Sequence, residues 1–200
     1  MKIPLKLYKT GPYEVINLNS IKKININSAK KLNASYHIYD DDMCRQFIKN
    51  NFNTFILNAY DNLIPTAYKA DLWRYCILYK NGGIYIDLSY NLIKNININK
   101  DNADMILTKD IPKNCFQIGF IASAPKNNFL KYVINKVCLN ILGNYKGKST
   151  LHVTGPCIFG ELFIAFFKKS FKKNDIIKPG LNKYKGIDGK TYLIDIKFKK

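Results

Sequence analysis

The chain has 200 residues, of which 47% are hydrophobic and 14% aromatic, so it can bury a core and is not an intrinsically disordered chain. No apolar run is long enough to cross a membrane as a helix, and residues 1–4 lead into a strand-like segment without a signal peptide. We therefore expect a single domain over residues 1–200, in the cytoplasm or in a compartment that the sequence does not identify.

The net charge of +18 is the most unusual property of the composition. It suits an anionic partner, such as a nucleotide, a nucleic acid, an acidic polysaccharide or a membrane surface. However, the lysines are spread along the chain, and arginine, the better bidentate phosphate ligand, occurs only at Arg45 and Arg74. A compositional bias toward Lys, Asn and Ile explains the charge better than a dedicated nucleic-acid surface, so we do not expect a nucleic-acid partner.

The cysteines and histidines form no zinc-binding pattern. There is no Cys-x-x-Cys pair, and the two histidines, His37 and His152, are far apart. A lone histidine is more often structural than functional, and His152 deserves the closer attention because Thr154 is near it. An odd, dispersed set of cysteines predicts reduced, buried thiols in a reducing compartment. The five are Cys44, Cys76, Cys115, Cys138 and Cys157.

The hydrophobic pattern predicts strands and helices along the chain, in an α/β fold. Expected strands are 3–8, 36–39, 84–89, 104–108, 117–122 and 191–198, and expected helices are 21–32, 43–50, 52–60, 70–80, 129–142 and 158–167. Residues 92–100 are either a strand or an ordered loop. We expect Asp41 or Asp42 to cap the helix that follows them rather than to bind a metal. Pro65 suits the first turn of a helix.

The most informative stretch is 69–91. Its first half has apolar residues at helical spacing and places Asp71 and Arg74 on one helix face. A Gly-Gly turn ends that helix, and the strand after it carries Asp87 and Ser89 on its polar face. An acidic strand end can hold a divalent cation or a ribose hydroxyl. The alternative is a structural salt bridge between Asp71 and Arg74, and the spacing alone does not separate the two interpretations.

This stretch resembles the core motif of the DXD-containing sugar transferases of glycosyltransferase family 32, which include fungal mannosyltransferases and, more distantly, clostridial toxin glucosyltransferases. In that family an Asp-x-x-Arg helix, a Gly-Gly turn and a strand ending in Asp-x-Asp follow one another, as in residues 70–75 (ADLWRY) and 79–87 (YKNGGIYID) here. Ser89 replaces the second Asp of the motif. The resemblance implies a GT-A-like fold, with a mainly parallel sheet flanked by helices.

Three further segments are similar to the family. Lys9 and Thr10 stand where the family has a Gln-Thr pair near the base of the donor. Gly119 opens a segment in which the preceding residue is usually Asn, whereas this chain has Ile118. The turn 154–156 (TGP) matches a family turn near the sugar and the acceptor, and its amides precede a helix, which suits a phosphate. The implied donor-binding residues are Thr10, Asp71, Arg74, Asp87, Gly119, Thr154 and Gly155.

The resemblance also implies the chemistry. Transfer from a nucleotide-diphosphate sugar leaves negative charge on the diphosphate, which Mn²⁺ or Mg²⁺ neutralises. Asp87 and Arg74 are the implied catalytic residues: Asp71 contacts the ribose or base, Arg74 positions the sugar, and Asp87 binds ribose and metal. Ser89, at the direct metal position, offers a neutral hydroxyl. A weakened metal site, metal-independent transfer assisted by lysines, and an inactive enzyme all remain possible.

We therefore expect a hexosyltransferase that moves mannose, glucose or galactose from a nucleotide-diphosphate sugar to a glycan or protein hydroxyl, with the retention of configuration that the family implies. The alternatives are a degenerate glycosyltransferase fold that binds a carbohydrate or a partner, and a basic nucleic-acid-binding protein. Related proteins continue with a segment that carries His or Trp, so a naturally short or truncated C-terminus is expected.

Overall fold

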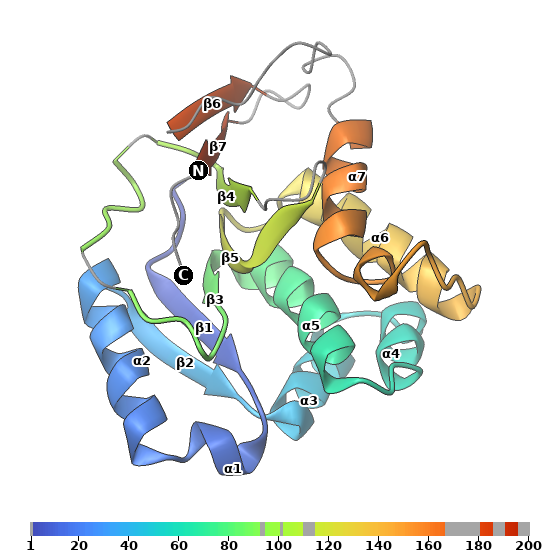
Figure 1. Ribbon diagram of the computed structural model, residues 1–200, viewed down its shortest axis with the longest axis horizontal. Coiled ribbons are helices and arrows are strands. Elements are labelled where there is room, and N and C mark those ends of the chain that lie inside the picture. Colours follow the sequence, from blue (N-terminus) through green and yellow to red (C-terminus); the bar gives the residue numbers. More distant parts are fainter. Residues whose placement is uncertain are drawn as a thin grey trace.

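The computed structural model describes residues 2–92, 95–100, 102–109 and 115–166, and the backbone of two strands at 181–185 and 191–195. Within these residues, one seven-stranded sheet lies between two groups of helices (Figure 1). The strands are β1 (Lys6–Thr10), β2 (Ser35–Tyr39), β3 (Gly83–Ile86), β4 (Met105–Lys109), β5 (Phe116–Ser123), β6 (Leu181–Lys185) and β7 (Thr191–Asp195). The helices are α1 (Tyr13–Ile16), α2 (Asn19–Leu32), α3 (Asp41–Asn51), α4 (Thr54–Asp61), α5 (Thr66–Asn81), α6 (Asn128–Leu142), the 3₁₀ helix η1 (Thr150–His152) and α7 (Pro156–Phe166).

The sheet has the strand order β2-β1-β3-β5-β4-β7-β6. Its pairings orient β1, β2, β3, β4 and β7 in one direction and β5 and β6 in the other. The sheet is therefore mixed but mainly parallel, which confirms the predicted α/β class. β5 runs against its neighbours β3 and β4, so its N-terminal half lies beside the C-terminal end of β3.

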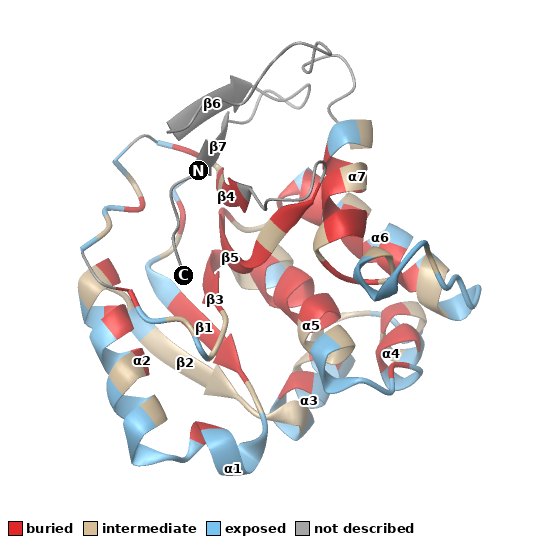
Figure 2. Ribbon diagram, viewed as in Figure 1, coloured by how far each residue is buried: buried red, intermediate tan, exposed pale blue. Residues whose placement is uncertain are grey.

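Side chains of β1 to β5 alternate between two cores, one on each face of this part of the sheet. Figure 2 shows buried residues along β1, β3, β4 and β5. Tyr8 and Tyr85 pack with helices α3 to α7 in the larger core. Leu7, Ile84 and Ile86 point the other way and pack against α2 and the segment after β3. Helix α5 has eight consecutive buried residues, from Asp71 to Leu78, and is the central helix of the larger core.

Several boundaries differ from those predicted. The strand expected over 84–89 is wrong at its end, since β3 ends at Ile86 and Asp87 and Ser89 lie in the coil and turn after it. Ile3 lies outside β1, since its backbone N–H and C=O both bond to the Asn99 side chain. Asp40, not Asp41 or Asp42, caps α3 by accepting a 2.8 Å hydrogen bond from the Met43 amide.

Asn53 caps α4 in the same way, so the helix predicted over 52–60 begins at Thr54. Pro65 is the N-cap residue of α5, next to the first-turn position expected for it. Residues 95–100 form coil and a turn and pair with no strand in the described part of the chain. The end of the last predicted strand, residues 196–198, lies outside the described residues.

The prediction of five reduced cysteines is wrong. Cys115 and Cys157 form a disulfide that ties the residue before β5 to the first turn of α7. The other three cysteines, Cys44, Cys76 and Cys138, are free and buried. A separation of 42 positions and the absence of a recognisable Cys pattern left no sign of this pair in the sequence.

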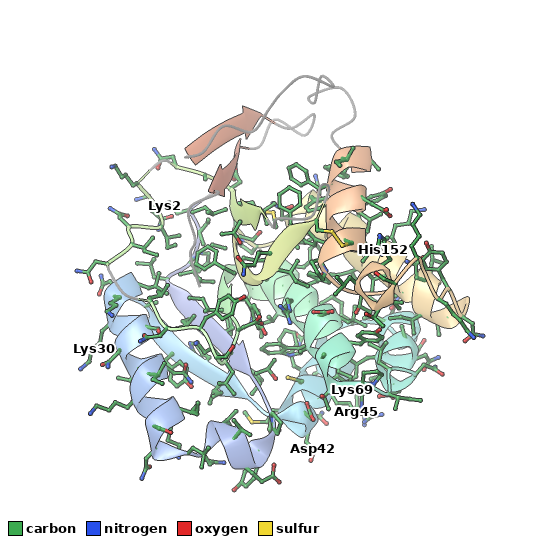
Figure 3. The ribbon with its side chains drawn as sticks, viewed as in Figure 1. Lys2, Lys30, Asp42, Arg45, Lys69 and His152 are labelled. Atoms are coloured by element: carbon green, nitrogen blue, oxygen red, sulfur yellow. A yellow bond between two sulfur atoms is a disulfide. The ribbon has the colours of Figure 1, made fainter. Side chains whose placement is uncertain are left out.

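Lysines lie on separate parts of the surface, as their spread along the sequence predicts. Lys2, Lys30 and Lys69 lie on three different parts of the molecule, the N-terminal segment, α2 and α5 (Figure 3). In the described residues, no helix is both long enough and apolar enough to cross a bilayer.

Candidate active site

The turn between α5 and β3 brings the acidic strand end back beside the helix. Gly82 ends α5 with φ of +63°, and Gly83 follows with φ of +114°, both in the region that favours glycine. A Cβ on Gly83 would also lie 2.7 Å from the Lys6 carbonyl oxygen, so β3 can pair closely with β1 only because this residue is glycine. Asp87, directly after β3, consequently returns to the level of Arg74.

Arg74 is the centre of the site. Its Nη2 lies 3.0 Å from Asp71 Oδ1, and its Nη1 lies 3.1 Å from Asp87 Oδ1 and donates to the Ile118 carbonyl at 2.9 Å. The guanidinium also lies over the Tyr85 ring, 4.4 Å from the centroid. Burial lowers the pKa of Arg74, but the neighbouring Tyr85 and the two carboxylates outweigh it, so the pKa is raised and the side chain stays charged. It joins α5, the end of β3 and β5.

Asp71 is buried beneath this network. Its second oxygen, Oδ2, accepts a 2.8 Å hydrogen bond from the Thr154 hydroxyl, and the Thr154 carbonyl accepts one of 2.9 Å from Tyr75. Burial raises the pKa of Asp71, while Arg74 and Thr154 oppose that shift by stabilising the carboxylate. The turn 154–156 is thereby fixed to α5 at the start of α7.

Asp87 is the more open carboxylate, with 32% of its side chain exposed. Its Oδ1 accepts hydrogen bonds from Arg74 and from the Tyr85 hydroxyl, at 3.1 and 2.9 Å. Its Oδ2 lies against Gly119, where a Cβ would be 2.5 Å away. Glycine at position 119 therefore leaves the space that Asp87 Oδ2 occupies, and within the described residues this oxygen accepts no hydrogen bond.

These residues surround a pocket of about 310 Å³. Five of the residues that the sequence predicted for the site line it: Asp71, Arg74, Asp87, Gly119 and Gly155. Thr154 is buried behind the wall and contacts Asp71 instead. Thr10 does not line the pocket, since its hydroxyl lies 3.1 Å from Cys44 Sγ, and neither does Ser89, which is exposed in the turn after β3.

Sequence reasoning missed the role of Lys9. This side chain is fully buried, and its Nζ donates to the Asp87 and Tyr90 carbonyls at 3.1 and 3.0 Å. Burial lowers the pKa of Lys9 to about 8, and Asp87 opposes the shift. Lys9 therefore holds the turn that carries Asp87 and Ser89. The sequence did contain a sign of this burial, because Lys9 lies two residues after Leu7 and therefore on the same inward-facing side of the strand.

Neither histidine reaches the pocket. His37 lies in β2, stacks on Tyr8 with the ring centroids 5.4 Å apart and shares a 2.9 Å hydrogen bond with Ser35. His152 lies in η1 rather than in a loop, with Nδ1 2.8 Å from Ser149 Oγ and Nε2 3.6 Å from Glu161 Oε1. These contacts are consistent with structural roles.

The donor set for a divalent cation is small. In the described part of the chain, no three His, Cys, Asp or Glu side chains gather as a metal-binding group. Arg74 and Thr154 already occupy the two oxygens of Asp71, which leaves Asp87 Oδ2 and, on the same turn, the Ser89 hydroxyl. Mg²⁺ commonly takes one or two carboxylates and completes its shell with phosphates and water. The residues thus fit a cation held mainly by a diphosphate.

The fold is GT-A-like. A solved structure, the PaToxG glycosyltransferase, superimposes with a TM-score of 0.64 over 82% of this chain and 68% of that chain, at 16% sequence identity. Residues 13–113, about half of the chain, match the family described as "Glycosyltransferase sugar-binding region containing DXD motif". The chain belongs to this family.

Two curated relatives extend the comparison. An uncharacterized glycosyltransferase, L373, of Acanthamoeba polyphaga mimivirus is 31% identical over 126 residues, which are 63% of this chain and 41% of the relative. Inositol phosphoceramide mannosyltransferase 3 of Schizosaccharomyces pombe is 43% identical over 53 residues, 26% of this chain and 15% of the relative. The chain therefore matches less than half the length of either relative.

Proposed function

We propose that the chain is a family 32 hexosyltransferase that moves mannose, glucose or galactose from a nucleotide-diphosphate sugar to a glycan or protein hydroxyl, with retention of configuration and assisted by Mn²⁺ or Mg²⁺. One observation carries the proposal: Asp71, Arg74 and Asp87 line the same pocket and are joined by ion pairs between α5 and the end of β3. A structural salt bridge alone would not need the open Asp87 carboxylate.

Arg74 is suited to position the sugar. Its Nε donates to the Ala70 carbonyl, and its Nη1 donates to Asp87 Oδ1 and to the Ile118 carbonyl. Its Nη2 forms the ion pair with Asp71 Oδ1. A guanidinium has five N–H donors, so one Nη2 hydrogen is left without a partner in the described residues. Because Asp71 and the Tyr85 ring hold the guanidinium in place, this donor is preorganised for a sugar or phosphate oxygen.

Asp87 is suited to hold the metal and the ribose. Its Oδ1 is fixed by Arg74 and Tyr85, which leaves Oδ2 for a ligand. Gly155, which also lines the pocket, directly precedes the first residue of α7, and the start of a helix favours a phosphate. When bound, the cation would neutralise the charge that develops on the leaving diphosphate.

The decisive experiment is calorimetric titration of UDP- and GDP-sugars, with and without Mn²⁺. We expect donor binding that requires Mn²⁺ and disappears in Asp87→Ala, while the exposed Asp42→Ala serves as the control and binds normally. Binding that ignores Mn²⁺ would overturn metal assistance but leave transfer in place. Absence of donor binding under every condition would overturn the enzyme proposal.

A degenerate binding module is the second candidate, and the position of Ser89 favours it. Ser89 is exposed, lies outside the pocket and supplies no carboxylate where the family has one. This candidate predicts sugar or partner binding without turnover. Donor hydrolysis assays on the native chain and on Ser89→Asp separate the two: activity in the native chain excludes degeneracy, and activity gained only in Ser89→Asp supports it.

A further inference from the structure

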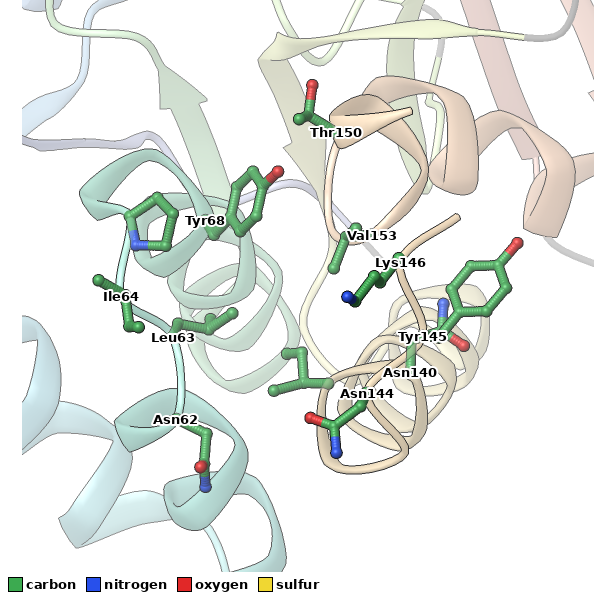
Figure 4. A pocket seen from close by; sticks show the side chains of 12 residues that line it. Asn62, Leu63, Ile64, Tyr68, Asn140, Asn144, Tyr145, Lys146, Thr150 and Val153 are labelled. Atoms are coloured by element: carbon green, nitrogen blue, oxygen red, sulfur yellow. The ribbon is translucent and has the colours of Figure 1, made fainter. Parts of the chain in front are cut away.

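Figure 4 shows a second pocket, of about 470 Å³. Its walls come from the connection between α4 and α5, from the C-terminal end of α6 and the segment after it, and from Val153, beyond η1. Nothing in the site described above uses this space.

The two pockets are adjacent, because Tyr68 and Thr150 line both of them. Tyr68 lies on α5, three positions before Asp71, and Thr150 opens the segment that leads to Gly155. A molecule held in the second pocket would therefore lie next to the pocket that Asp87 lines. This is the relationship that an acceptor must have with a donor.

The lining is suited to a hydroxyl-rich molecule. Asn140 and Asn144 contribute amide groups that, within the described residues, make no hydrogen bond through their side chains, so they can both donate and accept. Tyr68 and Tyr145 add aromatic rings with polar ends, and Leu63 contributes buried apolar surface. A few polar groups on a largely apolar wall are typical of a small-molecule site.

The charge of the pocket is also one-sided. Lys146 is the charged side chain among the lining residues, and no carboxylate lines the pocket. Figure 4 shows the Lys146 side chain directed into the space that these residues enclose. In the part of the chain that the structure describes, its ammonium forms no ion pair, in contrast to Lys148, which lies 4.0 Å from Glu161. An unpaired lysine at a pocket suits a phosphate, which it binds as a point charge.

We infer that this second pocket is the acceptor subsite and takes a sugar or polyol that carries a phosphate, with Lys146 as the phosphate ligand. The inference rests on the proposed function. In the transfer, an acceptor hydroxyl oxygen bonds to the anomeric carbon of the donor sugar, the bond from that carbon to the diphosphate breaks, and the diphosphate leaves with the electron pair and takes up the hydroxyl proton.

The test compares glucose 6-phosphate with glucose by calorimetric titration, in the absence of donor. We expect the phosphate to tighten binding and Lys146→Gln to weaken glucose 6-phosphate binding about tenfold, the loss expected for one charge-assisted contact. Lys148→Gln, two positions away and already near Glu161, is the matched control and should bind as the native chain does. Equal binding by Lys146→Gln and the native chain would overturn the inference.

A second arm identifies the source of the phosphate. Vesicles of phosphatidylcholine, with or without phosphatidylinositol, replace the soluble sugars in a sedimentation assay. Lys146-dependent binding to the phosphatidylinositol vesicles alone assigns the phosphate to a lipid headgroup. Lys146-dependent binding to glucose 6-phosphate alone assigns it to a soluble molecule. Either outcome supports the subsite. Titration of the nucleotide sugars into Lys146→Gln should be unchanged. If the native chain binds no donor, the proposed function fails, while the glucose 6-phosphate comparison still decides the fate of the subsite.

Discussion

The Thr154 hydroxyl lies 2.8 Å from an oxygen of Asp71, which precedes it by 83 positions in the chain, and both side chains are buried. The bond joins the start of α7 to the middle of α5, so it fixes one wall of the pocket to the helix that carries Arg74. Thr154 therefore acts on the site through Asp71, whereas Gly155, next to it, lines the pocket itself.

Thr154→Val should destabilise the protein. Valine keeps the shape but removes the donor, which leaves the buried Asp71 oxygen without its hydrogen bond, at a cost of about 1–3 kcal/mol. Urea unfolding followed by circular dichroism measures the change. Thr154→Ser keeps the hydroxyl and is the control, which should lie close to the native chain. A Thr154→Val variant as stable as the native chain would contradict the role given to this bond.

Arg74→Met should be among the most damaging single changes, because it leaves two buried or half-buried carboxylates without their partner. Breaking a buried ion pair in this way costs about 3–5 kcal/mol. Arg45 offers the comparison, since it forms a two-point contact with Asp61 on the exposed surface. Arg45→Met should cost far less, because water and salt screen an exposed ion pair. Equal losses in the two variants, measured by urea unfolding, would count against the network as the centre of the site.

Gly119→Ala should impair the site more than the fold. The new Cβ would lie 2.5 Å from Asp87 Oδ2 and 3.0 Å from the Tyr90 ring, so Asp87 must move. We expect nucleotide-sugar binding to fall by about tenfold or more, because a displaced ligand loses its geometry. Gly143→Ala, after α6 and with a negative φ, is the control. Calorimetric titration together with thermal unfolding checks the result, and normal donor binding by Gly119→Ala would refute it.

Ser89→Asp should strengthen metal binding. The change adds a carboxylate to the turn that carries Asp87, and a second anionic ligand should raise the affinity for Mn²⁺ by about tenfold or more. Ser20→Asp, in α2, adds the same charge at an exposed position and should leave the affinity unchanged. Mn²⁺ titration followed by electron paramagnetic resonance gives the affinity directly. An unchanged affinity would mean that residue 89 does not reach the cation.

The free energy of unfolding should depend on pH in a way that Lys9 determines. Its pKa is lowered to about 8 in the folded chain from 10.5, so between these two values the unfolded chain binds more protons than the folded one. The stability of the native chain relative to Lys9→Met should therefore rise with pH from about 8 to 10.5, by about 3 kcal/mol in total. Urea unfolding of both chains at several pH values checks the slope. A difference that stays constant or falls over this range would contradict the lowered pKa of the buried Lys9.

The residues at the centre of the site were predicted mainly from the family resemblance, because spacing alone did not separate a ligand site from a structural salt bridge between Asp71 and Arg74. Helical spacing predicted that Asp71 and Arg74 share one helix face, and the two side chains do form an ion pair. The Gly82–Gly83 turn predicted the end of the helix but not the contact between Arg74 and Asp87. The sheet class followed from local patterns, because apolar periods of 3.6 and 2 alternate along the chain.

What the sequence did not predict depends on contacts between distant residues. The Cys115–Cys157 bridge and the bonds between Ile3 and Asn99 join segments 42 and 96 positions apart, and neither has a local pattern. Asn53 is a different case. Its side chain accepts a hydrogen bond from the Ile56 amide at the start of α4, and the hydrophobic spacing does not show where such a cap begins a helix. The direction of Lys9 could have been inferred, since it shares a strand face with Leu7.

The chain has a single tryptophan, and it is the residue directly before Arg74. Trp73 is fully buried and lies against Tyr39 and Tyr85, with ring centroids 4.9 and 6.3 Å away. Arg74 is held in turn by groups 13 and 44 positions further along the chain, so this neighbourhood forms only once distant segments have met. The indole is thus a native fluorophore at the point where these segments meet. The change in its fluorescence during refolding therefore measures how fast the site assembles, without any introduced label.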